Sequence, residues 1–112
     1  MSKDIREDVV RRFRKIKSHT FRGNKYKIEV KKIVHDDYIY ALTDGPKTKG
    51  KKITIDPRHK DGYDLMETML DESIHACMWD INNDVVKDMA QGMAKFLWRA
   101  GFRLELIPEA TT

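Results

Sequence analysis

The sequence predicts an α+β fold built from an N-terminal helix, a small three-stranded, mainly antiparallel sheet, and two C-terminal helices. Apolar residues recur every three or four positions near the start of the chain and in its second half, as in helices with one buried face. Between these segments, apolar and charged residues alternate, as in half-buried strands. The 112 residues are enough for one hydrophobic core, so residues 1–112 are expected to form a single domain.

The first predicted element is a basic amphipathic helix in residues 1–18. Its apolar stripe lies within residues 4–17 and consists of Ile5, Val9, Phe13 and Ile16. Basic residues occupy the other side of this helix. We therefore expect a charged helical arm at the start of the domain.

Three strands are predicted in the middle of the chain. Residues 20–34 are rich in β-branched and aromatic residues, with a bend near Gly23-Asn24, and residues 38–42 form a second, short strand. Residues 43–50 are dense in turn formers and lead to the third strand at residues 52–56. Together these segments predict the small sheet.

Two helices are predicted after the strands. Asp61-Gly62 provides a start for a helix at residues 62–78, whose apolar residues have helical period. Residues 82–84, Asn-Asn-Asp, offer N-cap side chains for a second helix at residues 83–100. The buried stripe predicted for that second helix is Val86, Met89, Ala90, Met93, Leu97 and Ala100. A short strand or tail is expected at residues 102–107.

Charge is divided unevenly along the chain. The net charge of +4 is made up of +10 in residues 1–60, with 18 Lys and Arg against 8 Asp and Glu, and −6 in residues 61–112, with 4 against 10. A basic surface on the first half would attract nucleic acid or an acidic host protein. The alternative is a solvated lysine-rich surface without a partner, because these charges alternate with apolar residues.

The sequence predicts a cytoplasmic protein with no membrane partner. No apolar run approaches the roughly 20 residues that span a bilayer, and the N-terminus lacks the apolar stretch of a secretion signal. Cys77 is the single cysteine, which excludes an internal disulfide and fits a reducing compartment.

The most informative segment is residues 70–80, Leu-Asp-Glu-Ser-Ile-His-Ala-Cys-Met-Trp-Asp. In an H-E-x-x-H helix, the first and fifth residues lie one turn apart on one face and bind a single Zn²⁺, while the glutamate serves as general base. Here Glu72 and His75 keep the second and fifth positions, and Asp71 stands at the first. Carboxylate oxygen also binds zinc, so the altered motif still offers two ligands.

With its surroundings, this segment resembles a family of small phage-encoded zincin-like proteins, described as SprT-like metallopeptidases. The matching residues are 69–76, followed by Trp79 and Asp80. A second match lies further along the chain at residues 93–102, Met-Ala-Lys-Phe-Leu-Trp-Arg-Ala-Gly-Phe. The two matches occur at the separation that the family shows.

The resemblance extends to the sheet. Residues 21–28 resemble the first strand of that family, and residues 51–55 resemble its edge strand. In all, the resemblance covers roughly residues 20–103. It implies a minimal zincin-like core there, with residues 104–112 as a tail.

The resemblance implies a hydrolase that acts on a peptide or protein in the host cytoplasm. Glu72 would be the general base, and Asp71 and His75 would be metal ligands. The third ligand would be Asp80, Asp84 or Asp88. Lys87 and Gly92 stand where carboxylates are expected in the family. Because a carboxylate also replaces one imidazole, weak Zn²⁺ binding and weak or lost catalytic activity are expected.

Two functions from different classes are therefore left open. The first is a metallopeptidase-like enzyme that uses Glu72. The second is a non-catalytic zincin scaffold whose basic N-terminal half binds nucleic acid or an acidic host protein. At the motif itself, the alternative to a metal site is a polar helix face on which His75 forms a hydrogen bond with Asp71 one turn earlier.

Overall fold

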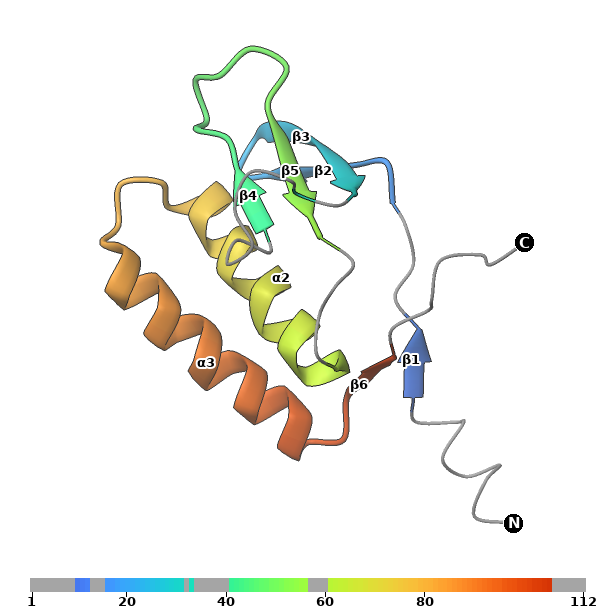
Figure 1. Cartoon of the computed structure of the whole chain (residues 1–112). Helices are drawn as coiled ribbons and strands as arrows, with labels where there is room; N and C mark the ends of the chain where they lie inside the picture. Colours follow the sequence, from blue (N-terminus) through green and yellow to red (C-terminus); the bar gives the residue numbers. More distant parts are fainter. Residues whose placement is uncertain (1–9, 13–15, 32, 34–40, 57–60, 106–112) are drawn as a thin grey trace, which may run out of the picture.

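The computed structural model describes residues 10–12, 16–31, 33, 41–56 and 61–105, and Figure 1 shows how they are arranged. These residues form two helices and six strands. The elements are β1 (Val10–Arg12), β2 (Ser18–Phe21), β3 (Asn24–Val30), β4 (Ala41–Thr43), β5 (Lys52–Ile55), α2 (Gly62–Cys77), α3 (Asn83–Arg99) and β6 (Arg103–Glu105). The predicted α+β class is confirmed.

Four of the strands form one mixed sheet in the order β2-β3-β5-β4. β2 pairs antiparallel with β3, and β4 pairs antiparallel with β5, whereas β3 and β5 run parallel. The predicted three-stranded sheet was therefore wrong by one strand, and it did not include the parallel pair.

The additional strand comes from a tight turn inside the predicted strand at residues 20–34. Arg22 and Gly23 form this turn, and both have a positive φ, of 47° and 82°. Two central residues with positive φ give a turn whose twist matches that of the flanking strands, so β2 and β3 pair as a hairpin. The usual sequence signals for such a turn are Asn-Gly and Asp-Gly. Here Arg22 precedes Gly23, so the sequence does not show the usual signal of a hairpin.

The edges of the sheet are β2 and β4, and both contact α2. The family resemblance predicts residues 51–55 as an edge strand, but β5 lies between β3 and β4. This prediction was wrong because β4 pairs with the side of β5 that would otherwise be free. Residues 38–40 of the predicted strand at 38–42 lie outside the described residues.

A separate pair of strands, β1 and β6, runs parallel, with Val10 opposite Arg103. The predicted N-terminal helix is therefore wrong at residues 10–12, and it is also wrong at residues 16–18, where the chain enters β2. Local periodicity could not reveal a backbone partner so far along the chain. Residues 1–9 and 13–15 lie outside the described residues. Of the strand or tail expected at residues 102–107, β6 is a strand, and it includes residues 104 and 105, which were assigned to the tail.

Both helices begin and end within one residue of their predicted bounds. The Asp61 side chain caps α2 by accepting a hydrogen bond from the backbone N–H of Asp64, and Asn82 caps α3 in the same way. A Cβ at Gly62 would overlap the backbone carbonyl of Leu104. Glycine therefore allows α2 to start directly against β6.

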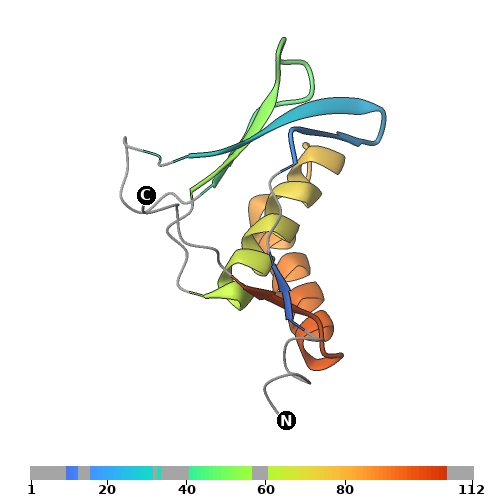
Figure 2. The ribbon, with the colours of Figure 1, turned by 90° about the vertical axis from the view of Figure 1, so that its right-hand side faces the viewer.

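α2 lies between the sheet and α3, and both helices are on the same side of the sheet (Figure 2). The buried cluster that joins α2 to the sheet consists of Tyr26, Ile53, Ile55, Leu65 and Ala76. The cluster that joins α2 to α3 consists of Ile74, Val86 and Ala90. Met93 and Ala100 were expected in the buried stripe of α3 but are exposed, whereas Ala94 is buried. Within the described residues, neither helix has the length and apolar character needed to cross a bilayer.

Candidate functional site on helix α2

Glu72 lies on the side of α2 that faces the sheet. Leu65, Met69 and Ala76 on this side pack in the cluster between helix and sheet. Glu72 falls between Met69 and Ala76 at helical spacing, so its carboxyl group enters an otherwise apolar layer. The predicted alternative of a polar helix face therefore does not describe Glu72.

Thr43 on the edge strand β4 meets this carboxyl group. Its Oγ1 donates a hydrogen bond of 2.5 Å to Glu72 Oε1. Burial raises the pKa of Glu72 above its usual range, because the charged form loses its contact with water. The Thr43 hydrogen bond opposes this rise, the negative charge of Asp71 adds to it, and His75 opposes it. Glu72 therefore holds its proton more tightly than a solvated glutamate.

Asp71 and His75 pair along the same helix. His75 Nε2 lies 3.1 Å from Asp71 Oδ1, across one turn of α2. Their side chains are 27% exposed for Asp71 and 19% exposed for His75, so both can be reached from solvent. The local pair considered from the sequence is confirmed. The His75 ring also meets the ring of Trp79 edge-on, with 6.4 Å between the ring centroids.

The paired atoms of Asp71 and His75 are spaced like two ligands of one metal ion. From the usual bond lengths, two donors of a tetrahedral zinc ion lie about 3.4 Å apart, close to the separation found here. Among the described residues, no three His, Cys, Asp or Glu side chains are grouped so that they could hold a metal ion. Asp84 is in the first turn of α3, and Asp80 follows the end of α2. The Zn²⁺ ion and its third ligand stay predictions.

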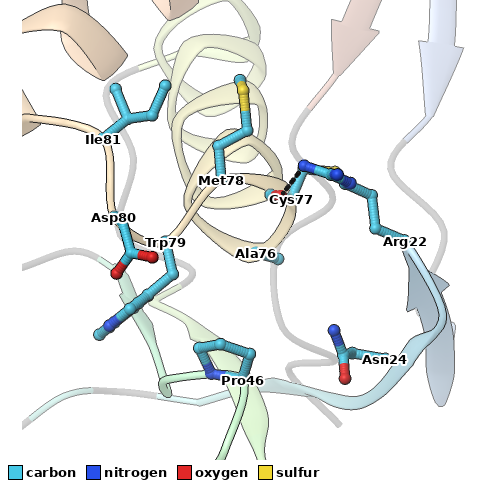
Figure 3. A pocket seen from close by; sticks show the side chains of 9 residues that line it. All are labelled: Arg22, Asn24, Pro46, Ala76, Cys77, Met78, Trp79, Asp80 and Ile81. Atoms are coloured by element: carbon cyan, nitrogen blue, oxygen red, sulfur yellow. Dashed lines mark hydrogen bonds between the residues drawn. The ribbon is translucent and has the colours of Figure 1, made fainter.

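A hollow of about 530 Å³ opens at the C-terminal end of α2 (Figure 3). Arg22 reaches it from the β2–β3 turn, and its Nη1 donates a hydrogen bond of 3.0 Å to the carbonyl oxygen of Cys77. This bond satisfies one of the carbonyls that a helix end leaves unpaired. Trp79 and Asp80 line the same hollow. Asp80 therefore lines a concavity to which Asp71, Glu72 and His75 do not contribute.

A second, apolar cavity of about 240 Å³ lies between α2 and the sheet. Its wall includes Phe21, Ile28, Ile53 and Met69, and Glu72 is part of that wall. A carboxyl group with a perturbed pKa at the wall of an apolar cavity is typical of sites that bind a ligand and transfer protons. The arrangement is thus able to hold an apolar group beside Glu72.

Sequence reasoning identified Asp71, Glu72 and His75 but not Thr43. No local pattern marks Thr43, because its partner Glu72 is 29 positions further along the chain. The register of β4 against β5, with Thr43 opposite Ile53, brings its hydroxyl group to α2. Such a register depends on contacts that a single sequence does not display.

No family model, no curated protein and no solved structure matches this chain. The relationship to zincin-like proteins therefore stays a prediction from the motif and its surroundings.

Proposed function

We propose that this chain is a zincin-like protein with an altered metallopeptidase site, in which peptidase activity is weak or lost. Asp71 and His75 would hold a divalent metal ion, with Zn²⁺ as the first candidate. Glu72 would be the general base, and the substrate would be a peptide or protein. The observation that carries this proposal is the 3.1 Å approach of Asp71 Oδ1 to His75 Nε2, one residue away from the buried carboxyl group of Glu72.

The residues around the pair suit this chemistry. A bound metal ion would polarise a carbonyl group and acidify a water molecule. The raised pKa of Glu72 brings its proton exchange closer to neutral pH, where a general acid or base is most effective. Thr43 orients the carboxyl group through its hydrogen bond. The partial exposure of Asp71 and His75 leaves room for a substrate to approach.

Two features would make the site weaker than an intact H-E-x-x-H site. A carboxylate stands at position 71 in place of an imidazole, which favours harder ions such as Mg²⁺ and Mn²⁺ relative to zinc. In addition, a metal ion would have to replace the contact between Asp71 and His75. We therefore expect low zinc affinity and little or no hydrolysis in the unaltered protein.

Restoring the motif tests the proposal. Zinc affinity is measured by competition with a chromophoric chelator for the unaltered protein, Asp71→Ala, His75→Ala and Asp71→His. We expect each alanine variant to lose at least about tenfold in affinity and Asp71→His to gain at least about tenfold. Peptide hydrolysis is then measured for Asp71→His with and without Glu72→Gln, and it is expected only where Glu72 is kept.

Glu67→Ala is the matched control, because Glu67 is another partly buried carboxylate on α2, one turn before Asp71. Its zinc affinity should equal that of the unaltered protein. Thermal melts followed by circular dichroism establish that each variant is folded. Equal zinc affinity in the unaltered protein, Asp71→Ala and His75→Ala would refute the proposal.

A further inference from the structure

The side of the sheet that faces away from the helices is strongly basic. Both helices lie on the opposite side (Figure 2). Along β3, Tyr26 and Ile28 point toward the helices and join the core, so the alternate residues Lys25, Lys27 and Glu29 point outward. We call the lysines of β3 and β5 that point outward, together with Lys31 at the end of β3, the lysine face: Lys25, Lys27, Lys31 and Lys52.

Glu29 is at the centre of three of these lysines. Its carboxylate oxygens lie 3.1 Å from Lys52 Nζ, 3.6 Å from Lys31 Nζ and 3.8 Å from Lys27 Nζ. Lys27 and Lys52 are also directly opposite each other in the pairing of β3 with β5. Like charges in that position repel each other, and one carboxylate can neutralise only one of the three ammonium groups. The lysine face therefore keeps a positive excess that a bound anion would relieve.

A hollow of about 330 Å³ lies at one end of the lysine face. Its lining consists of Ser18, Lys25, Lys27, Gly50 and Lys51. Three lysine side chains and one serine side chain thus border a concave space, together with a glycine. All of these side-chain groups can donate hydrogen bonds to phosphate oxygens, and this lining includes no carboxylate.

We propose that the lysine face binds the phosphate backbone of duplex DNA without reading its sequence. Lysine ammonium groups are compact point charges that suit phosphates, whereas protein–protein interfaces are depleted of lysine and enriched in aromatic residues. Proteins that bind single strands stack the bases on aromatic rings, and the lining of the hollow at this face includes none. The phosphate backbone of a duplex fits this surface better than a single strand or an acidic protein.

The charge of the rest of the molecule would orient the duplex. Residues 61–105, which form both helices and β6, carry 9 Asp and Glu against 4 Lys and Arg, a net charge of −5. This acidic part lies on the other side of the sheet and would repel DNA. The inference does not depend on a metal ion at Asp71 and His75, so the two proposals fail independently.

Binding of the full chain to a fluorescently labelled duplex of arbitrary sequence, followed by anisotropy between about 50 and 200 mM salt, tests the inference. The informative variant is Lys27→Gln with Lys52→Gln. We expect its dissociation constant to rise at least about tenfold and its salt dependence to become shallower by about two units of logarithmic slope. Glu29→Gln should have the opposite effect and tighten binding, because it removes the negative charge from the lysine face.

The matched control is Lys87→Gln with Lys95→Gln, which removes the same charge from exposed positions on α3. This variant should bind within about twofold of the unaltered protein. Equal weakening by the two double variants would overturn the inference, and so would the absence of binding by the unaltered protein at the lowest salt. Tighter binding to a poly-glutamate chain or to a single strand than to the duplex would overturn it in favour of those partners.

Discussion

The two sides of the sheet shift the pKa of a glutamate in opposite directions. On the side covered by α2, the carboxyl group of Glu72 enters an apolar layer, and burial raises its pKa. On the open side, the hydrogen bond and charge of Lys52, followed by the charges of Lys31 and Lys27, hold the pKa of Glu29 below its usual range despite some desolvation. Protonation is thus favoured for Glu72 on the covered side, and the charged form is favoured for Glu29 on the open side.

This difference separates two kinds of chemistry within a small chain. The covered side excludes water and can hold a proton-transferring group close to Asp71 and His75. The open side keeps its lysine side chains exposed to water, where they can contact a charged partner but contribute little to stability. Substitutions on the two sides should therefore differ in the size and the sign of their effects on folding.

The largest expected difference concerns two leucines. Leu65 is 2% exposed in the cluster between α2 and the sheet, whereas Leu42 on β4 is 48% exposed. Leu65→Ala should lower the free energy of unfolding by about 2–5 kcal/mol, because it leaves a cavity in the core. Leu42→Ala should lower it by less than about 1 kcal/mol. Urea unfolding of both variants measures this, and equal losses would contradict the contrast.

Two glycines give the next largest difference. Gly62→Ala should destabilise the protein by about 1–3 kcal/mol, because the added methyl group overlaps the Leu104 carbonyl and forces α2 away from β6. Gly92→Ala, in the exposed middle of α3, meets no neighbouring atom and should stabilise the protein by up to about 1 kcal/mol. Thermal unfolding of the two variants should therefore shift in opposite directions.

Glu72 should give the protein a stability that decreases as the pH rises. Its raised pKa means that the folded state binds a proton more tightly than the unfolded state. The cost of the buried charge is thus full above the raised pKa and disappears as the pH falls below the ordinary glutamate pKa. The change takes place in the pH interval between the ordinary and the raised pKa of Glu72. Glu72→Gln should therefore be more stable than the unaltered protein, and this difference should be largest at the upper end of that interval.

Unfolding in urea between about pH 3 and pH 8 measures this trend. Thr43→Val is the companion variant, because the Thr43 hydrogen bond lowers the pKa of Glu72. Without that bond the pKa of Glu72 should rise further, and the interval should extend to higher pH. A stability difference between Glu72→Gln and the unaltered protein that is independent of pH would contradict the burial of this carboxyl group.

The smallest effect is expected for Glu29, and its pH trend has the opposite sign. Because the folded-state pKa is lowered, Glu29 stabilises the fold above the ordinary glutamate pKa, and this contribution is lost as the pH falls through the lowered value. Glu29→Gln should therefore be slightly less stable near neutral pH and equal to the unaltered protein in acid. Added salt should remove the difference at neutral pH, since the pairs lie on an open surface.

The predictions from sequence succeeded where structure depends on neighbouring residues. The period of apolar residues and the caps Asp61 and Asn82 located both helices to within one residue. They failed where the structure of a segment depends on contacts with residues far away in the chain. Val10–Arg12 has a sequence that suits a helix, but the segment is a strand paired with β6. Arg22 in a positive-φ position also concealed the hairpin that adds a strand to the sheet.

The candidate site divides in the same way. The contact between Asp71 and His75 follows from a spacing of four residues on one helix, and it was anticipated. Glu72 points toward the sheet because of the rotation of α2 about its axis relative to β4 and β5. The whole apolar layer between helix and sheet sets this rotation. Thr43 belongs to the site only because of strand register. Local chemistry could thus be predicted from the sequence, but its surroundings could not.

The pairing of β1 with β6 has a consequence for the order of folding. Val10 and Arg103 are 93 positions apart in the chain, and each of the two strands has only three residues. Closing so large a loop is slow and entropically costly, and three-residue strands return few hydrogen bonds for it. This pair should form last and open first, so its amide protons should exchange with deuterium long before those of the central strands.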